Sequence, residues 1–374
     1  MRTLRATSLA LLLLALGPGA TVLSQDAPPS PAPSADPLPS PVATASLATP
    51  VPLASDLAWT DISPSRGPAA REDHTWTVDG DGRFAYLFGG RDGGQAFDDL
   101  WRYDLATDTW QRLAPRGLKP APRFGHSAVW TADRGLVVFA GQRGADFFGD
   151  LWAYDPTTDS WSELPGNGSA PKARYGSCMI MGLDGRLWIS HGFTFAGRFD
   201  DTRAYNLATE RWTSIAPDGR RPGERCLHDC FTSATGELVL YGGQDNSSAA
   251  LADLWVTRPD GTWERQTDPR SGARRLYAVT EAGSEAWVCG GVGADNDPLG
   301  DLWRIDRETL EFESETVTGA TPSARYGATL ITDAARGRLL LFGGQGQRAR
   351  ADLWQLGPAP TSSGAEASPS LEQG

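Results

Sequence analysis

The sequence has no excess of positive charge, and this argues against one broad class of function. Its 34 lysine and arginine residues stand against 46 aspartate and glutamate residues, a formal net charge of −12. A protein that binds nucleic acid in general needs a basic surface, so DNA and RNA are not expected partners. A net charge of this size mainly favours solubility.

Long apolar segments are missing after the first 25 residues, so we do not expect membrane insertion. The opening stretch, "MRTLRATSLALLLLALGPGATVLSQ", has two arginines, an apolar run and then small residues. It is typical of a secretory signal peptide, which we place at residues 1–24, with cleavage before Gln25. No cysteine follows the apolar run, so we expect no lipid anchor. The expected location is secreted, either extracellular or periplasmic.

Two further segments contain few large apolar side chains that could form a core. Residues 25–56 and 358–374 are rich in proline, alanine and serine, a composition typical of disordered linkers and tails. The stretch between them, residues 57–357, is about 300 residues long, which suffices for one large domain or two ordinary ones.

One glycine recurs along this stretch with a nearly constant period. The successive steps are 51, 51, 51, 48 and 53 residues. The positions are Gly90, Gly141, Gly192, Gly243, Gly291 and Gly344. Six repeats of about fifty residues indicate a repeat architecture, because six copies of one ligand site would be unusual.

Each repeat has the pattern of four short strands. In the second repeat these are "FGHSAVW", "LVVFAG", "DLWAYD" and "SWSEL", separated by residues that favour turns. A four-stranded antiparallel sheet repeated around an axis is a β-propeller blade. We therefore predict an all-β protein, a six-bladed β-propeller, over residues 57–357.

The last repeat lacks its fourth strand, and the first is preceded by an extra one. An aromatic residue marks the fourth strand of the other five repeats: Trp110, Trp161, Trp212, Trp263 and Phe312. The stretch "LAWTDI" stands before the first repeat, and Trp59 lies 51 residues ahead of Trp110. We predict that this N-terminal strand completes the last blade and closes the ring, which hides edges that would otherwise aggregate.

The repeated motif P-x-x-R-[FY]-G-[HS]…GG…DLW-x-YD…W resembles that of the kelch-repeat propellers. The resemblance implies the fold, but kelch propellers include protein-binding modules, the central domain of galactose oxidase, a sialic-acid epimerase and iron-dependent specifier proteins. The iron motif E-x-x-x-D-x-x-x-H is missing, as is the sialidase box S-x-D-x-G-x-T-W. The tyrosines that a galactose-oxidase copper site would need are repeat residues, so we expect no metal or other cofactor.

Six arginines begin the first strands, on the face that also carries the loops after the glycine pairs. They are Arg71, Arg123, Arg174, Arg225, either Arg274 or Arg275, and Arg325. In protein-binding kelch domains the matching arginines line a ligand pocket, and such a ring would suit a carboxylate or an acidic peptide. Six aspartates begin the third strands on the same face, so internal ion pairing is the competing interpretation.

The third repeat departs most from the pattern. It replaces the glycine pair by "SHG" and "DLW" by "DTR", and its loop reads "FTFAGRFDD". Aromatic residues beside arginine favour sugar stacking or a peptide anchor, although phenylalanines can also fill their own loop. The candidate binding residues here are His191, Phe193, Phe195, Arg198, Phe199 and Arg203.

We therefore predict a secreted, monomeric scaffold that binds a protein or a glycan through the face that carries the arginine ring and the long loops between second and third strands. The alternative is a carbohydrate-active enzyme, epimerase-like or oxidase-like, that uses the same face. An enzyme would need an acid–base pair outside the repeat pattern. The candidate cluster for that role is His191, Arg203, His228 and Asp229.

The cysteines favour a disulfide over a metal site. In an extended strand Cys226, His228 and Cys230 would share one side, but no fourth ligand is evident. Cys226 and Cys230 would then lie too far apart to bridge. Cys178 and Cys230 have the opposite parities that facing neighbour strands need, so they are the predicted disulfide.

Two further groups are predicted to be structural. Cys289 takes the place of a core aromatic residue and is expected to be a buried thiol. Three histidines share one register, three residues after the repeat arginine, where a structural hydrogen bond is expected. They are His74, His126 and His228.

Overall fold

The computed structural model describes residues 53, 56–215, 219–258, 260–267, 269–317 and 319–358. The predicted signal peptide, the linker apart from residues 53 and 56, and the tail after residue 358 lie outside this part. Every regular element within it is a strand. The described residues thus contain no helix long and apolar enough to cross a membrane.

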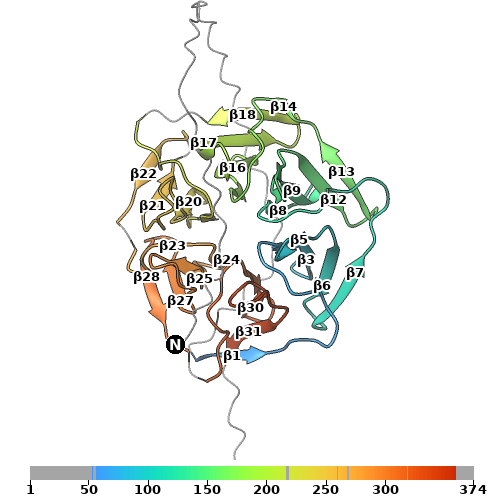
Figure 1. Ribbon diagram of the computed structural model, residues 1–374, viewed down its shortest axis with the longest axis vertical. Coiled ribbons are helices and arrows are strands. Elements are labelled where there is room, and N and C mark those ends of the chain that lie inside the picture. The colour runs from blue at the N-terminus through green and yellow to red at the C-terminus, as the bar shows by residue number, and fades with distance from the viewer. Residues whose placement is uncertain are drawn as a thin grey trace, which may run out of the picture. The chain divides into compact units, whose positions relative to one another are not determined.

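Six blades of four antiparallel strands surround a central axis, as the sequence pattern predicts, and one blade carries a fifth strand (Figure 1). The first blade comprises β2 (Thr75–Val78), β3 (Phe84–Phe88), β6 (Leu100–Asp104) and β7 (Thr109–Leu113). The second comprises β8 (Ser127–Thr131), β9 (Gly135–Phe139), β12 (Leu151–Asp155) and β13 (Ser160–Leu164). The third comprises β15 (Cys178–Met181), β16 (Leu187–Thr194), β17 (Gly197–Asn206) and β18 (Arg211–Ile215), with β14 (Asn167–Gly168) added parallel to β18.

The other half of the ring repeats this order. The fourth blade comprises β19 (Asp229–Thr232), β20 (Leu238–Tyr241), β21 (Leu254–Thr257) and β22 (Trp263–Arg265). The fifth comprises β24 (Ala278–Ala282), β25 (Glu285–Cys289), β27 (Leu302–Asp306) and β28 (Phe312–Glu315). The sixth comprises β29 (Thr329–Asp333), β30 (Arg338–Phe342), β31 (Leu353–Pro358) and the N-terminal β1 (Leu57–Asp61).

The N-terminal strand closes the ring. β1 pairs with β31 along its whole length, with Trp59 opposite Leu356. Trp59 is buried in a cluster that also contains Trp287 of the fifth blade. The predicted closure is confirmed, and the edge of β31 is covered by backbone hydrogen bonds from β1.

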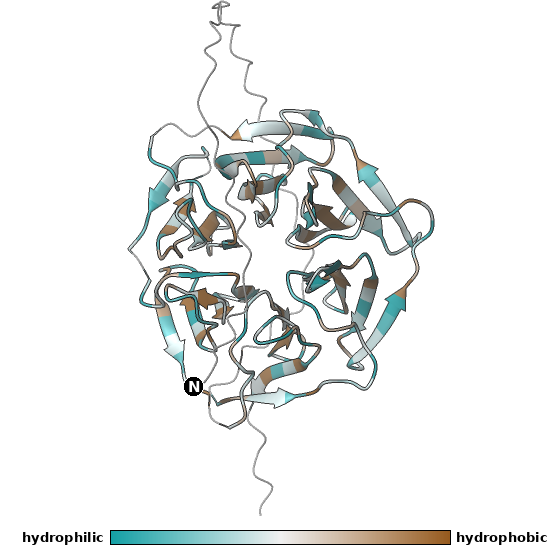
Figure 2. Cartoon of the chain, in the orientation of Figure 1, coloured by the Kyte–Doolittle hydropathy of each residue, from teal (hydrophilic) through white to brown (hydrophobic). Residues whose placement is uncertain are grey.

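The core consists of apolar clusters between neighbouring blades. Val137 of β9 and Leu187 of β16, both fully buried, belong to one such cluster. Figure 2 shows the hydrophobic residues gathered on the inner strands and the hydrophilic ones toward the outer strands. Each blade therefore depends on its neighbours to bury its faces, as expected of a repeat fold.

A closed ring of backbone hydrogen bonds surrounds one end of the central channel. The residue two positions after each repeat arginine donates its N–H to the equivalent carbonyl of the preceding blade, at 2.8 to 2.9 Å. All six have φ between 54° and 64°. They are Asp73, Gly125, Gly176, Leu227, Leu276 and Gly327. At Gly125 a side chain is excluded, since a Cβ there would lie 1.9 Å from the Tyr175 ring.

We call the side of the propeller where the first strands begin the upper face, and the opposite side the lower face. Because the strands alternate in direction, the loops between second and third strands also lie on the upper face. Short pairs extend several of these loops. They are β4 (Arg91–Asp92) with β5 (Gln95–Ala96), β10 (Gln142–Arg143) with β11 (Asp146–Phe147), and β26 (Val292–Gly293) with β23 (Arg274–Arg275).

Candidate functional site

The six repeat arginines are buried and hold their own blades together. Arg71 donates to the two carboxylate oxygens of Asp99 at 2.7 and 2.9 Å and to the Gly89 carbonyl at 2.8 Å. Its side chain is 0% exposed. The other pairs are Arg123–Asp150, Arg174–Asp201, Arg225–Asp253, Arg274–Asp301 and Arg325–Asp352. The arginine of the fifth repeat is thus Arg274.

Of the two interpretations of this ring, the structure shows the internal pairing, and binding of a ligand by these arginines stays a prediction. Burial raises the pKa of the Asp99 carboxyl, but the hydrogen bonds and charge of Arg71 outweigh it and leave that pKa below its usual value. Removing one member of such a pair leaves an uncompensated buried charge, which is strongly destabilising. The guanidinium groups are structural elements of the fold.

Phe199 belongs to the same structural unit. The Arg71 guanidinium lies 4.3 Å from the centroid of the Phe97 ring. Arg123 lies over Phe148 and Arg174 over Phe199 at the same distance. Phe199 is thus the third copy of a residue that covers the repeat arginine, and not a free binding residue.

Arg203 takes over the role of the tryptophan that it replaces. In the first blade the indole N–H of Trp101 donates to Asp99 at 2.7 Å, and four other blades repeat this bond. In the third blade the Arg203 Nε donates to Asp201 at 3.0 Å. The substitution therefore keeps the hydrogen bond of the repeat and leaves Arg203 tied to the blade.

His191 is fully buried, with a φ of 56° at a position where other blades have glycine or alanine. Its Nδ1 shares a hydrogen bond with the Ser190 hydroxyl, and its ring lies 5.5 Å from that of His228. Burial lowers the pKa of His191 to about 3, so the ring is neutral. Of the candidate acid–base cluster, His191 and His228 lie together, whereas Arg203 is paired with Asp201.

An aromatic cluster remains exposed on the upper face. Phe195, at the turn between β16 and β17, is 69% exposed. Its ring meets Phe147 edge-on at 4.9 Å and Phe193 at 6.2 Å. Phe147 and Phe193 are partly buried and pack on Phe124 and Tyr175. The cluster thus presents one exposed ring on a packed aromatic base, the geometry of a binding anchor.

Arg198 lies over the Phe193 ring of this cluster at 5.3 Å, and its charge acts on Arg275. Arg198 donates from Nε to the Cys226 sulfur at 3.2 Å and from a terminal nitrogen to Gln244 at 2.8 Å. Arg275 donates to Asn296 at 2.8 Å. Burial, and to a lesser degree the charge of Arg198, lower the pKa of Arg275. Among the described residues, neither guanidinium forms an ion pair with an acid.

An acidic group lies on the first blade. Arg91 binds Glu72 at 3.0 Å and Asp73 at 3.1 Å, and the Tyr175 hydroxyl donates to Asp73 at 3.2 Å. Burial, followed by the charge of Asp73, raises the pKa of Glu72 to about 8. The Arg91 guanidinium thus pairs with both carboxyl groups.

Sequence reasoning missed Glu72, Arg91 and the involvement of Arg275. They could have been found from the position directly after each repeat arginine, because the residue type there differs from blade to blade while the flanking residues recur. Its occupants are Glu72, Phe124, Tyr175, Cys226, Arg275 and Tyr326.

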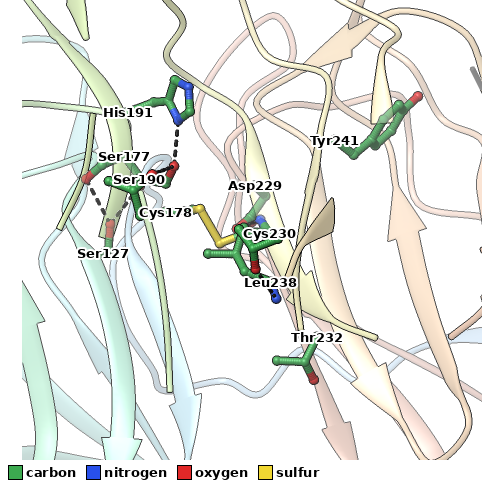
Figure 3. Close-up of a disulfide and its surroundings, with 12 residues drawn as sticks. Ser127, Ser177, Cys178, Ser190, His191, Asp229, Cys230, Thr232, Leu238 and Tyr241 are labelled. Atoms are coloured by element: carbon green, nitrogen blue, oxygen red, sulfur yellow. Dashed lines mark hydrogen bonds between the residues drawn. A yellow bond between two sulfur atoms is a disulfide. The ribbon is translucent and has the colours of Figure 1, made fainter. Parts of the chain in front are cut away.

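A disulfide joins Cys178 of β15 to Cys230 of β19 across the third and fourth blades, with Cα atoms 5.9 Å apart (Figure 3). This is the pair that strand parity indicates. The left-handed φ of 58° at Leu227 breaks the alternation that would have put Cys226, His228 and Cys230 on one side, so the metal hypothesis loses its geometric basis.

The remaining buried groups behave largely as structural residues. Burial raises the pKa of the Cys289 thiol to about 12, as expected of an inert core cysteine. His74 and His126 share hydrogen bonds with Thr329 at 2.6 Å and Thr75 at 2.9 Å. His228 instead packs against His191.

Comparison with known proteins agrees with this architecture. The family model described as the KLHDC2/KLHL20/DRC7 Kelch-repeats domain matches residues 53–243. Kelch domain-containing protein 10 of Xenopus tropicalis is 28% identical over 272 residues, which is 66% of this chain and 65% of that protein. The human protein of that name is 26% identical over 282 residues, covering 69% and 63%.

A further similarity is to a much longer protein. The dynein alpha chain of the flagellar outer arm of Chlamydomonas reinhardtii is 26% identical over 319 residues, 78% of this chain but 7% of that one. The aligned part of this chain thus spans less than two thirds of the length of these relatives.

Proposed function

The chain belongs to the kelch-repeat family of β-propellers, and we propose that it is a secreted scaffold that binds a protein partner through its upper face. The observation that carries this proposal is Phe195, the one large aromatic side chain among the described residues that is exposed. A rigid aromatic residue on a packed base is a frequent anchor of protein interfaces. Secretion is supported by the N-terminal sequence.

The arginine pair indicates what the partner presents next to this anchor. Arg198 and Arg275 have amide partners and the Cys226 thiol, but no ion pair with an acid in the described part of the chain. A carboxylate from the partner would accept charge-assisted hydrogen bonds from these donors. The net charge of −12 provides no long-range attraction to an acidic partner. Recognition of a short acidic and apolar segment would therefore depend on close contacts.

The test is recovery of a secreted protein on the immobilised mature chain, followed by titration of that protein against variants. Phe195→Ala should weaken binding by about tenfold or more, while Leu183→Ala, an exposed apolar residue in the turn between β15 and β16, should not. A glycan array run on the same preparation separates the two ligand classes. Specific glycan binding, or an unchanged affinity in Phe195→Ala, would refute the proposal.

A further inference from the structure

The charged side chains that line the central channel are all acidic. The channel has an upper chamber of about 260 Å³ and a lower funnel of about 770 Å³. Among the described residues no lysine or arginine lines either one. The lining acids are Asp73 and Asp229 above and Asp79, Asp81 and Glu281 below. Burial lowers the pKa of the three histidines in the upper wall, so they add no positive charge at neutral pH.

An apolar ring separates the two spaces. One residue from each first strand, five positions after the repeat arginine, lines both. These residues are Trp76, Ala128, Met179, Cys230, Val279 and Leu330. The funnel has the size of a small-molecule site, typically about 300 to 1,000 Å³. Its walls are the inner strands, so a protein partner could not bury there the roughly 800 Å² that a stable interface needs on each side.

Asp229 lies just above this ring with little to neutralise it. Its carboxylate accepts one hydrogen bond, from the Cys230 N–H at 2.9 Å, although a carboxylate has about four acceptor sites. The hydroxyl of the nearby Tyr277 donates a hydrogen bond to the Tyr241 carbonyl oxygen at 2.7 Å.

The other groups around Asp229 bring no positive charge. They are the neutral His228 beside it and the disulfide to Cys178 on the preceding blade (Figure 3). Asp73 also lines this chamber, but Arg91 pairs with it at 3.1 Å. Burial raises the pKa of Asp229 to about 7. Asp229 is partly exposed and lines the upper chamber, so the ammonium group of a bound cation could reach its carboxylate and take up the unused acceptor sites.

We propose that the central channel binds a small organic cation, an amine whose ammonium group pairs with Asp229 and whose apolar body packs on the apolar ring. Glu281 is paired with Arg307 at 2.9 Å, so Asp79 and Asp81 are the funnel acids that favour entry of a cation from the lower face. The opposite end is narrowed by Tyr175, which reaches Asp73 across Gly125. The site is separate from the upper-face surface, so either proposal can fail without the other.

Calorimetric titration of the mature chain with three matched probes tests this inference. 4-Phenylbutylamine should bind at least about tenfold more tightly than the neutral 4-phenylbutan-1-ol, because the ammonium gains a charged partner. The anion 4-phenylbutyrate should bind least. Asp229→Asn should weaken amine binding by about tenfold and leave the alcohol unchanged. Asp133→Asn, an exposed acid in a lower-face turn outside the channel lining, is the matched control.

The pH profile gives a second readout. Amine affinity should rise between pH 6 and 8 as Asp229 loses its proton, and Asp229→Asn should abolish that rise. If Asp229→Asn does not fold, Ala128→Met, which narrows the apolar ring, should weaken the amine while Phe195→Ala should not. Equal affinity for amine and alcohol, insensitivity to these channel variants, or no binding at millimolar amine would overturn the proposal.

Discussion

Arg203 donates its Nε–H to Asp201 at 3.0 Å, in the place where the other five blades use the indole N–H of a tryptophan. Arg203 departs from the tryptophan of the repeat, but its hydrogen bond to the aspartate is the same as in the other blades. Departure from a repeat is therefore not by itself a sign of function in this propeller, and the bonding of each departing residue decides its role.

This relationship predicts how substitutions at position 203 behave. Arg203→Trp should fold with a stability close to that of the parent, because the indole restores the bond of the other blades. Arg203→Ala should lose about 1 kcal/mol, the typical contribution of one hydrogen bond. Urea unfolding of both variants measures the difference. A Trp variant that is less stable than the Ala variant would contradict this role for Arg203.

Phe195 and Trp152 should separate binding from stability. Phe195 is 69% exposed, so Phe195→Ala should change the melting temperature little. Trp152 is 7% exposed and donates to Asp150 at 2.8 Å, so Trp152→Ala should lose about 3–5 kcal/mol. Arg198→Ala should also destabilise, since its guanidinium joins the loop of the third blade to Gln244 of the fourth. Early melting of Phe195→Ala would show that this ring is part of the core.

Deletion of residues 1–63 should destabilise the propeller and reduce its solubility. β1 covers the edge of β31, and Trp59 fills part of the core of the sixth blade. Without it, β31 would present unpaired backbone groups to other molecules. Melting curves and light scattering of the deletion variant check this, with deletion of residues 25–50 as the control. An unchanged melting temperature would show that β1 is dispensable.

The disulfide should account for a measurable part of the stability. Cys178 and Cys230 are 52 residues apart in sequence, and bridges of this kind typically contribute about 2–4 kcal/mol. The double variant Cys178→Ser, Cys230→Ser should unfold at lower urea concentration than the parent. Peptide mapping without reductant should recover the Cys178–Cys230 link, and four free thiols would refute it.

Glu72 should make the propeller less stable as the pH rises. Its pKa is raised from 4.5 to about 8, mainly by burial, so the folded state binds more protons than the unfolded state between these values. The stabilisation is complete below pH 4.5 and is lost as the pH rises through 8. Glu72→Gln should therefore flatten the pH dependence of unfolding above pH 5. If Glu72→Gln shows the same pH dependence of the free energy of unfolding as the parent, the neighbouring Asp73 is the group responsible.

The fold could be predicted from the amino-acid sequence, because it depends on local patterns that recur. The 51-residue spacing from Trp59 to Trp110 already placed the closing strand in the last blade. The parities of Cys178 and Cys230 likewise indicated their pairing, since alternation along a strand is a local property. Turn residues and apolar runs of each repeat were sufficient for the six blades.

Which residues are available to a ligand depends on how the blades pack in three dimensions. Arg123 and Asp150 lie 27 residues apart in sequence, and whether they bind each other or a partner depends on a distance of 2.7 Å. Phe195 and Phe199 look alike in one loop, yet one is exposed and the other packs against a buried guanidinium. Arg198 and Arg275 approach each other because the ring places the third, fourth and fifth blades in succession. Such contacts arise from packing between blades, which no local pattern encodes.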